Sequence, residues 1–120
     1  MPKEIKLMAI AENELEQAQG LQYIRALPDL SGMLFKFKHP RVLSFWMINT
    51  SIPLEICFIN HENMIVKTEQ MIPYSTRSVT SGRPCVMALE VAAGDFARVG
   101  ACVGKTVSID LEQKKVIIHD

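Results

Sequence analysis

The sequence predicts a mainly β protein, either an antiparallel β-sandwich or a partly closed barrel of roughly seven to nine short strands with two short helices. Apolar runs of strand length recur along the chain, and most are separated by turns rather than by long helices. Only two segments carry helix start and stop signals. With 120 residues, 48% of them hydrophobic, the chain can bury one core, so residues 1–120 are taken as a single domain.

The N-terminal part predicts a strand followed by a short helix. Apolar side chains dominate residues 5–10, although their alternation is imperfect. Asn13 is placed to cap a helix, Glu16 to reach back toward that cap, and Gly20 to end the helix after about two turns. The composition of residues 28–32 is that of a turn.

The middle of the chain predicts four strands. Residues 33–37 form the first, and His39-Pro40-Arg41 is expected to break it. Residues 42–48 and 54–59 are nearly continuous apolar runs, which is typical of strands covered on both faces. Residues 60–63 are polar and predict the tip of a hairpin before a strand over 64–68.

The C-terminal part begins with an irregular segment, residues 69–83, that predicts a surface loop. A strand over 85–91 follows, and then a short helix that Asp95 caps and Gly100 ends. The last two strands are expected over residues 106–111 and 115–118.

Charge and composition narrow the partners. Lys plus Arg and Asp plus Glu each number 13, so nothing favours nucleic acid or an anionic membrane. No apolar run approaches the ~20 residues of a membrane span, and the N-terminus lacks the apolar stretch of a signal peptide, so we expect a cytoplasmic protein. The three cysteines lack paired spacing and are expected to be buried, reduced thiols. Neither histidine spacing nor glycine motifs predict a metal or another cofactor.

Several short motifs occur in a recognisable order. Gly-Met-Leu-Phe occupies residues 32–35, Ser-Phe-Trp-Met occupies residues 44–47, and Asn49-Thr50 and Ile-Pro-Leu at 52–54 follow. This pattern resembles that of domain of unknown function family 192, small uncharacterised prokaryotic β-rich proteins. The resemblance covers about residues 10–110, and it also includes the following positions: Gly20-Leu21, Arg25, Leu27-Pro28, Phe58-Ile59, Leu89-Glu90, Gly94, Gly100, Val103-Gly104 and Val107.

The chain departs from the family pattern at a few positions. Gln22 stands where the family usually has Met, Ile48 where it usually has Lys, and Glu55 where it usually has Asp. Tyr23-Ile24 lengthens the spacer before Arg25 by about one residue. The resemblance implies a mostly β fold and no established activity.

The segment from Trp46 to Pro53 is the first candidate site. A Trp can stack on a ring or a sugar, while the amide of Asn49 and the hydroxyl of Thr50 offer hydrogen bonds at a strand end. The alternative is structural: Trp46 belongs to the core, and Asn49 and Thr50 satisfy backbone groups at a bend. Both interpretations hold if the bend forms the wall of a groove.

Glu90 is the second candidate, because it sits within an apolar strand. A buried carboxylate needs a cation or hydrogen-bond donors, and Arg25 and Arg77 are the candidate partners. Glu90 is then a member of a structural ion pair, an exposed edge residue, or a general base with a raised pKa.

Three classes of function follow. The preferred one is a non-enzymatic binding module that holds a small ligand or a peptide near the bend at 46–53. The alternative is a protein-interaction or oligomerisation module, as a monomer or homodimer. Less favoured is a hydrolase-type enzyme that uses Glu90 and Arg77, with Asn49 as a third member. We expect the partner to be a small molecule or a protein.

Overall fold

The structure is a computed structural model that describes residues 3–120, so Met1 and Pro2, which begin the N-terminal segment considered above, lie outside the described residues. Within this range the chain forms seven strands and two short helices. In chain order these are β1 (Glu4–Ala11), α1 (Glu14–Gln19), β2 (Ser31–Phe45), β3 (Leu54–Ile59), β4 (Ile65–Met71), β5 (Val79–Ala92), α2 (Asp95–Val99), β6 (Thr106–Asp110) and β7 (Lys115–His119). The mainly β class with two short helices is confirmed.

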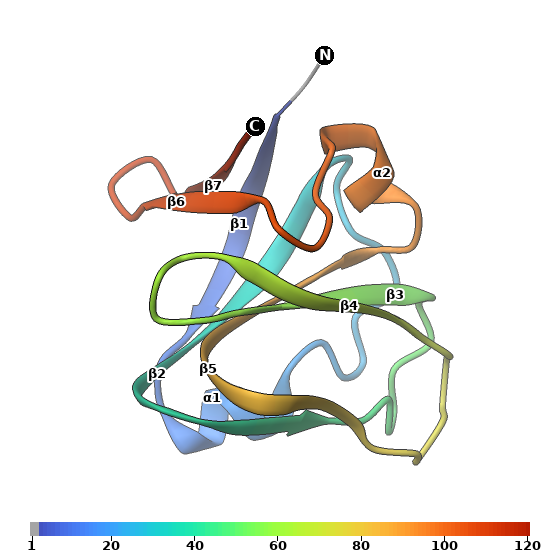
Figure 1. Cartoon of the computed structure of the whole chain (residues 1–120). Coiled ribbons are helices and arrows are strands. Elements are labelled where there is room, and N and C mark those ends of the chain that lie inside the picture. The colour runs from blue at the N-terminus through green and yellow to red at the C-terminus, as the bar shows by residue number, and fades with distance from the viewer. Residues whose placement is uncertain (1–2) are drawn as a thin grey trace.

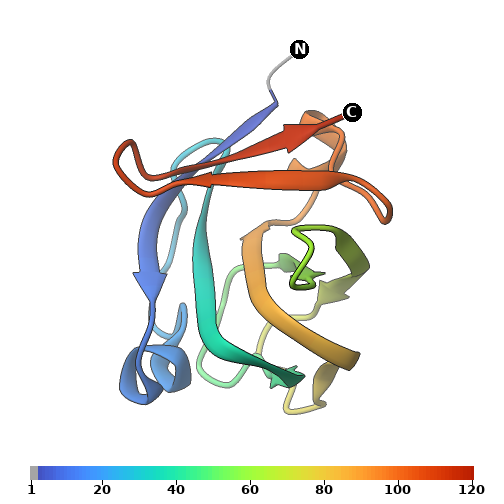
Figure 2. The same cartoon turned by 60° about the vertical axis from the view of Figure 1, so that its left-hand side comes forward.

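The strands form one curled sheet, in the order β4-β3-β5-β2-β1-β7-β6 (Figures 1 and 2). The curl brings the edge strands β4 and β6 together at one end, where Met64 and Thr106 form an isolated bridge. No ladder of paired residues joins these edges within residues 3–120, so the sheet is open. Neither a sandwich nor a closed barrel is confirmed.

The prediction of an antiparallel sheet is wrong for one pair of strands. β1 and β2 run parallel, with Ile10 opposite Leu34, whereas the other ladders are antiparallel. Parallel neighbours need a crossover connection. Helix α1 and residues 20–30 supply it, and α1 follows the end of β1 (Figure 2), where the Gln17 amide donates to the Lys36 carbonyl of β2 at 2.7 Å. We call residues 41–45 of β2, which follow its register shift, the outer arm of this strand.

Two strands are longer than the sequence predicts. The expected break at residues 39–41 is wrong, because β2 runs through it; the pairing of β2 with β5 shifts register between Lys36 and Arg41. The expected loop over 69–83 is shorter, because β4 extends to Met71 and β5 begins at Val79. Coverage of residues 42–48 on both faces is also wrong, since Val42 is exposed. The strand continues through His39-Pro40-Arg41 because pairing with β5 on both sides outweighs the local tendency of these residues to end a strand.

The sheet buries apolar side chains on both faces. Neighbouring residues of β5 point to opposite sides, so that Leu89 belongs to one apolar cluster and Ala88 to the other. Helix α2 contributes Phe96 to the first cluster, while the second includes Leu21 and Met47 from the connections around β2. The second cluster lies on the side of the sheet that carries the candidate site.

The first helix is capped as predicted. The side-chain oxygen of Asn13 accepts the Glu16 N–H at 2.8 Å, the Glu16 carboxylate accepts the Glu12 N–H at 3.1 Å, and Gly20 follows the last helical residue.

The second helix differs from the prediction at its N-terminus. Gly94, not Asp95, occupies the cap position, and Asp95 is the first helical residue. Glu55 on β3 takes over the capping role, because one of its carboxylate oxygens accepts the Phe96 N–H at 2.9 Å and the other accepts the Gln70 amide at 2.6 Å. Gly100 ends the helix with a φ of 73°, as its sequence position predicts.

The cysteines are only partly as expected. Cys57 and Cys85 are buried, and burial raises the pKa of the Cys57 thiol to about 12. Cys102 is exposed, so the expectation of burial is wrong there; it lies in the turn between α2 and β6 rather than in a strand. Neither helix found in residues 3–120 is long and apolar enough to cross a membrane.

Candidate ligand-binding site

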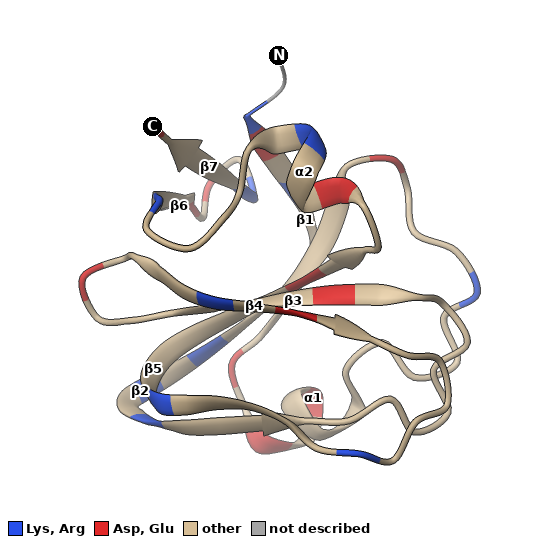
Figure 3. Ribbon diagram, turned by 45° about the vertical axis from the view of Figure 1, so that its right-hand side comes forward, with Lys and Arg blue, Asp and Glu red and all other residues tan. Residues whose placement is uncertain are grey.

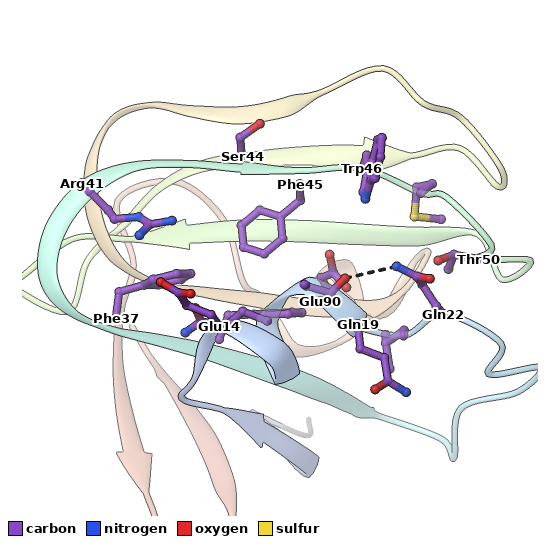
Figure 4. Close-up of a pocket in the computed structure, with 16 residues that line it drawn as sticks. Glu14, Gln19, Gln22, Phe37, Arg41, Ser44, Phe45, Trp46, Thr50 and Glu90 are labelled. Carbon is purple, nitrogen blue, oxygen red and sulfur yellow. Dashed lines mark hydrogen bonds between the residues drawn. The ribbon is translucent and has the colours of Figure 1, made fainter.

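A cavity of about 330 Å³ opens beside α1 and the outer arm of β2 (Figure 4). Small-molecule sites commonly occupy ~300–1,000 Å³. The cavity is lined by residues of α1 and the turn after it (Glu14, Gln17, Ala18, Gln19, Gly20, Leu21, Gln22), of β2 and the bend after it (Phe35, Phe37, Arg41, Ser44, Phe45, Trp46, Met47, Thr50), and by Glu90 of β5. It combines aromatic walls with polar groups.

Glu90 lies deep in the cavity. Its side chain points to the same face of the sheet as Ala88, and the residues opposite it on the neighbouring strands are Met33 and Ile56, both buried and apolar. Only 4% of its surface is exposed, yet Figure 4 shows its carboxyl directed into the cavity. Its carboxyl takes part in none of the side-chain hydrogen bonds or ion pairs found in residues 3–120, and burial alone raises its pKa to about 8. Glu90 therefore holds its proton at neutral pH and keeps its hydrogen-bonding capacity free.

Gly32 on β2 lets the backbone approach Glu90 closely. A Cβ at this position would lie 2.3 Å from the carbonyl oxygen of Glu90 and 2.9 Å from Cγ1 of Val91. No side chain fits at such distances, which explains physically why the Gly-Met-Leu-Phe motif begins with Gly. The same close approach fixes the part of β5 from which Glu90 projects.

Trp46 and Thr50 line the cavity, as the first candidate site predicts. Trp46 is 51% exposed, so the alternative that it belongs to the core is wrong. Thr50 is buried, and its hydroxyl donates to the Ile48 carbonyl at 3.0 Å. The structural interpretation therefore holds for Thr50, although its side chain also faces the cavity.

Asn49 does not line the cavity but holds part of its wall. Its φ of 54° is left-handed, a conformation that Asn tolerates better than most residues. Its carbonyl accepts the Tyr23 N–H at 2.9 Å, and its amide donates to the Gln22 side chain at 3.2 Å. Asn49 thus ties the bend after β2 to the turn after α1.

Arg25 and Arg77 do not reach the cavity, so the predicted pairing of Glu90 with either residue is wrong. Both are exposed and neither lines the cavity. Arg77 lies on the connection between β4 and β5, where its guanidinium pairs with Glu69 at 2.9 Å. Because Arg77 lies outside the cavity that Glu90 lines, a hydrolase built on these two residues has no geometric support.

Several lining residues escaped the sequence reasoning. Arg41 was assigned to a strand break, but the register shift in β2 leaves it in the strand, with its guanidinium 4.9 Å from the ring centre of Phe37. Glu14 lies in the short helix predicted after Asn13, and Gln22 stands out in the sequence only as a departure from the family pattern. Figure 3 shows acidic residues on α1. The heptapeptide 14–20 is rich in Glu and Gln, but the sequence does not say which structure it faces.

Metal binding has no support in the described part of the chain, where no three His, Cys, Asp or Glu side chains cluster. The site is thus an aromatic and polar cavity around a single buried carboxyl group.

The fold and this cavity define a small β-rich domain with one curled sheet and a mixed aromatic and polar hollow. The model of the family DUF192, described as "Uncharacterized ACR", matches residues 3–109, and the chain belongs to this family. No curated protein matches it.

Two solved structures are similar. A protein of unknown function from Novosphingobium aromaticivorans DSM 12444 is 32% identical with a TM-score of 0.80, over 85% of this chain and 74% of that one. A protein from Sinorhizobium meliloti 1021, described as "a putative transcription regulator", is 34% identical with a TM-score of 0.76, over 79% of this chain and 74% of that one.

Proposed function

We propose that this chain is a non-enzymatic binding module that holds a small ligand in the cavity between α1 and the outer arm of β2. The observation that carries the proposal is the carboxyl of Glu90, which is buried, directed into the cavity and without a partner among residues 3–120. No side-chain oxygen of the described residues is both fully buried and without a partner, so the Glu90 carboxyl opens onto the cavity rather than being sealed in the core. A ligand in the cavity can therefore bond directly to this carboxyl, in surroundings where a hydrogen bond is stronger than in water.

The rest of the cavity supports a binding role. Trp46 and Phe45 offer apolar and stacking surface, while Ser44, Thr50 and Gln19 add polar atoms. The cavity thus combines aromatic surface with many polar groups, which suits a ligand that is itself partly polar. We prefer binding to catalysis because the cavity holds no nucleophile paired with a base within the described residues.

Native mass spectrometry of gently purified protein, with a matched denatured spectrum, is the first test. We expect extra mass that disappears on denaturation. The second test records amide NMR spectra of the apo protein with a chemically diverse fragment library; we expect hits that shift residues around Glu90 and Trp46.

Trp46→Ala is expected to weaken these hits, whereas Tyr74→Ala is the matched control. Both aromatic residues are exposed and follow strands of the same sheet, but Tyr74 does not line the cavity. The proposal fails if no fragment shifts the cavity residues, or if both variants weaken binding equally.

A protein-interaction module is the second candidate, and one feature favours it. Tyr23, Trp46 and Tyr74 are exposed on three loops that backbone hydrogen bonds tie together, from Tyr23 to Asn49 and from Tyr74 to Thr50. Tyr23 and Tyr74 also have left-handed φ values of 65° and 63°, a strained conformation for bulky residues. Sedimentation analysis tests self-association: dimers that Tyr74→Ala dissolves would support this role, and a monomer at every concentration would argue against it.

A further inference from the structure

We infer that the ligand of this cavity is a small organic cation, a primary ammonium on an aromatic or apolar body, with the carboxylate of Glu90 as its counter-ion. The inference rests on the proposed binding function and specifies its ligand. Glu90 supplies the first argument: it is the one buried carboxyl among the described residues that line the cavity, and no protein cation reaches it in that part of the chain. An ammonium group can form a charge-assisted hydrogen bond with this carboxylate, about twice as strong as a neutral one.

The aromatic walls supply the second argument. Phe35, Phe37, Phe45 and Trp46 all line the cavity, and the rings of Phe35 and Phe45 meet edge to face at 4.9 Å. The faces of such rings attract cations. The protein already shows one such contact, since the Arg41 guanidinium lies over Phe37. A cationic ligand with an apolar body therefore matches both the carboxyl and the walls.

The charges that face Glu90 provide the third argument. Among the described residues that line the cavity, only Glu14 on α1 and Arg41 on β2 are also charged. Figure 4 places Arg41 with Phe37 at one end of the cavity and Trp46 with Thr50 at the other, with Glu90 between them. The strand neighbours Met33 and Ile56 carry no charge. With Glu90 ionised, two carboxylates face one guanidinium that already has an aromatic partner, which favours a cationic occupant.

Binding of the cation is linked to the proton of Glu90. Because burial raises the pKa of this carboxyl to about 8, an ammonium ligand must displace a proton that the free protein holds at neutral pH. One proton leaves to solvent for each cation bound. The affinity for the cation therefore falls about tenfold for each pH unit below 8.

Three matched probes test the inference: benzylamine, benzyl alcohol and benzoate, which differ in charge on nearly the same body. Each is titrated at pH 8 and pH 6 while amide NMR spectra of the wild type, Glu90→Gln and Glu62→Gln are recorded. Glu62 lies on the exposed hairpin and is the control. We expect benzylamine to bind at least about tenfold more tightly than benzyl alcohol at pH 8, and to lose that advantage at pH 6 and in Glu90→Gln. Glu62→Gln is expected to behave as wild type.

The outcomes separate this inference from the binding function itself. Tighter binding of benzyl alcohol or benzoate at the same residues would overturn the cation and leave the binding module standing. Equal benzylamine affinity in wild type and Glu90→Gln would overturn the counter-ion role. If none of the three probes binds, the proposal of a cationic ligand is overturned. The fragment library described above then decides whether the cavity binds another kind of ligand.

Discussion

Replacing Glu90 with Gln is expected to remove the pH dependence of stability that this residue imposes. Burial raises the pKa of Glu90 to about 8 from its ordinary value of 4.5. Between these two pH values the folded protein holds a proton that the unfolded chain has released. The free energy of unfolding therefore falls as pH rises through this window, and the stabilising effect of the bound proton is lost above pH 8.

The magnitude follows from the width of the window. Each pH unit inside it removes about 1.4 kcal/mol from the free energy of unfolding, so the whole window removes a few kcal/mol. Gln cannot ionise and has nearly the same shape as Glu. Relative to wild type, Glu90→Gln is thus expected to gain stability steadily from about pH 5 to pH 8 and to be the more stable protein at pH 9.

Urea unfolding of both proteins at pH values from 5 to 9 measures this difference, and the pH dependence of all other groups cancels in it. Glu62→Gln, on the exposed hairpin, is the control and is expected to track the wild type. A difference that stays constant with pH would refute a raised pKa. A constant difference in favour of wild type across this pH range would mean that Glu90 is ionised and paired, because a lowered pKa changes stability only below the ordinary value of 4.5.

Three further substitutions test the framework of the site, each by chemical denaturation. Gly32→Ala is expected to cost at least about 2 kcal/mol because its Cβ would meet the Glu90 backbone, and a cost below about 0.5 kcal/mol would contradict that close approach. Asn13→Ala is expected to cost about 1 kcal/mol through loss of the α1 cap, with Asn13→Asp close to wild type; equal losses in both would argue against the cap. Glu55→Ala is expected to cost about 1–3 kcal/mol because the Phe96 N–H loses its buried acceptor, and an unchanged midpoint would show that this bond is dispensable.

Local signals in the sequence predict much of the fold. The apolar run over 54–59 matches β3, the Asn13 and Gly20 signals match both ends of α1, and Gly100 ends α2. These features depend on a few neighbouring residues, whose capping and alternation act over one or two turns. Alternation also places Glu90 and Ala88 together on one face of β5.

The features that escaped prediction depend on residues far apart in the chain. Residues 39–41 locally favour the end of a strand, but pairing with β5 is stronger, so β2 continues through them with a register shift. The parallel pairing of β1 with β2 follows from a crossover that turn signals alone do not specify. For the same reason the sequence shows that Glu90 lies in an apolar strand, but it does not show which residues surround Glu90 in space. The sequence suggests Arg77 as a partner, whereas in the structure α1 and the bend at Trp46 line the cavity together with Glu90.

The most direct measurement is an NMR titration of the side-chain carboxyl of Glu90, assigned by the loss of its signal in Glu90→Gln and recorded with and without benzylamine. If Glu90 is buried without a partner in the free protein and pairs with the bound cation, its pKa is near 8 in the free protein and lower when the amine is bound. A pKa near the ordinary 4.5 in the free protein would show that Glu90 is solvated or already paired. That result would contradict both the unpartnered carboxyl and the ligand site built on it.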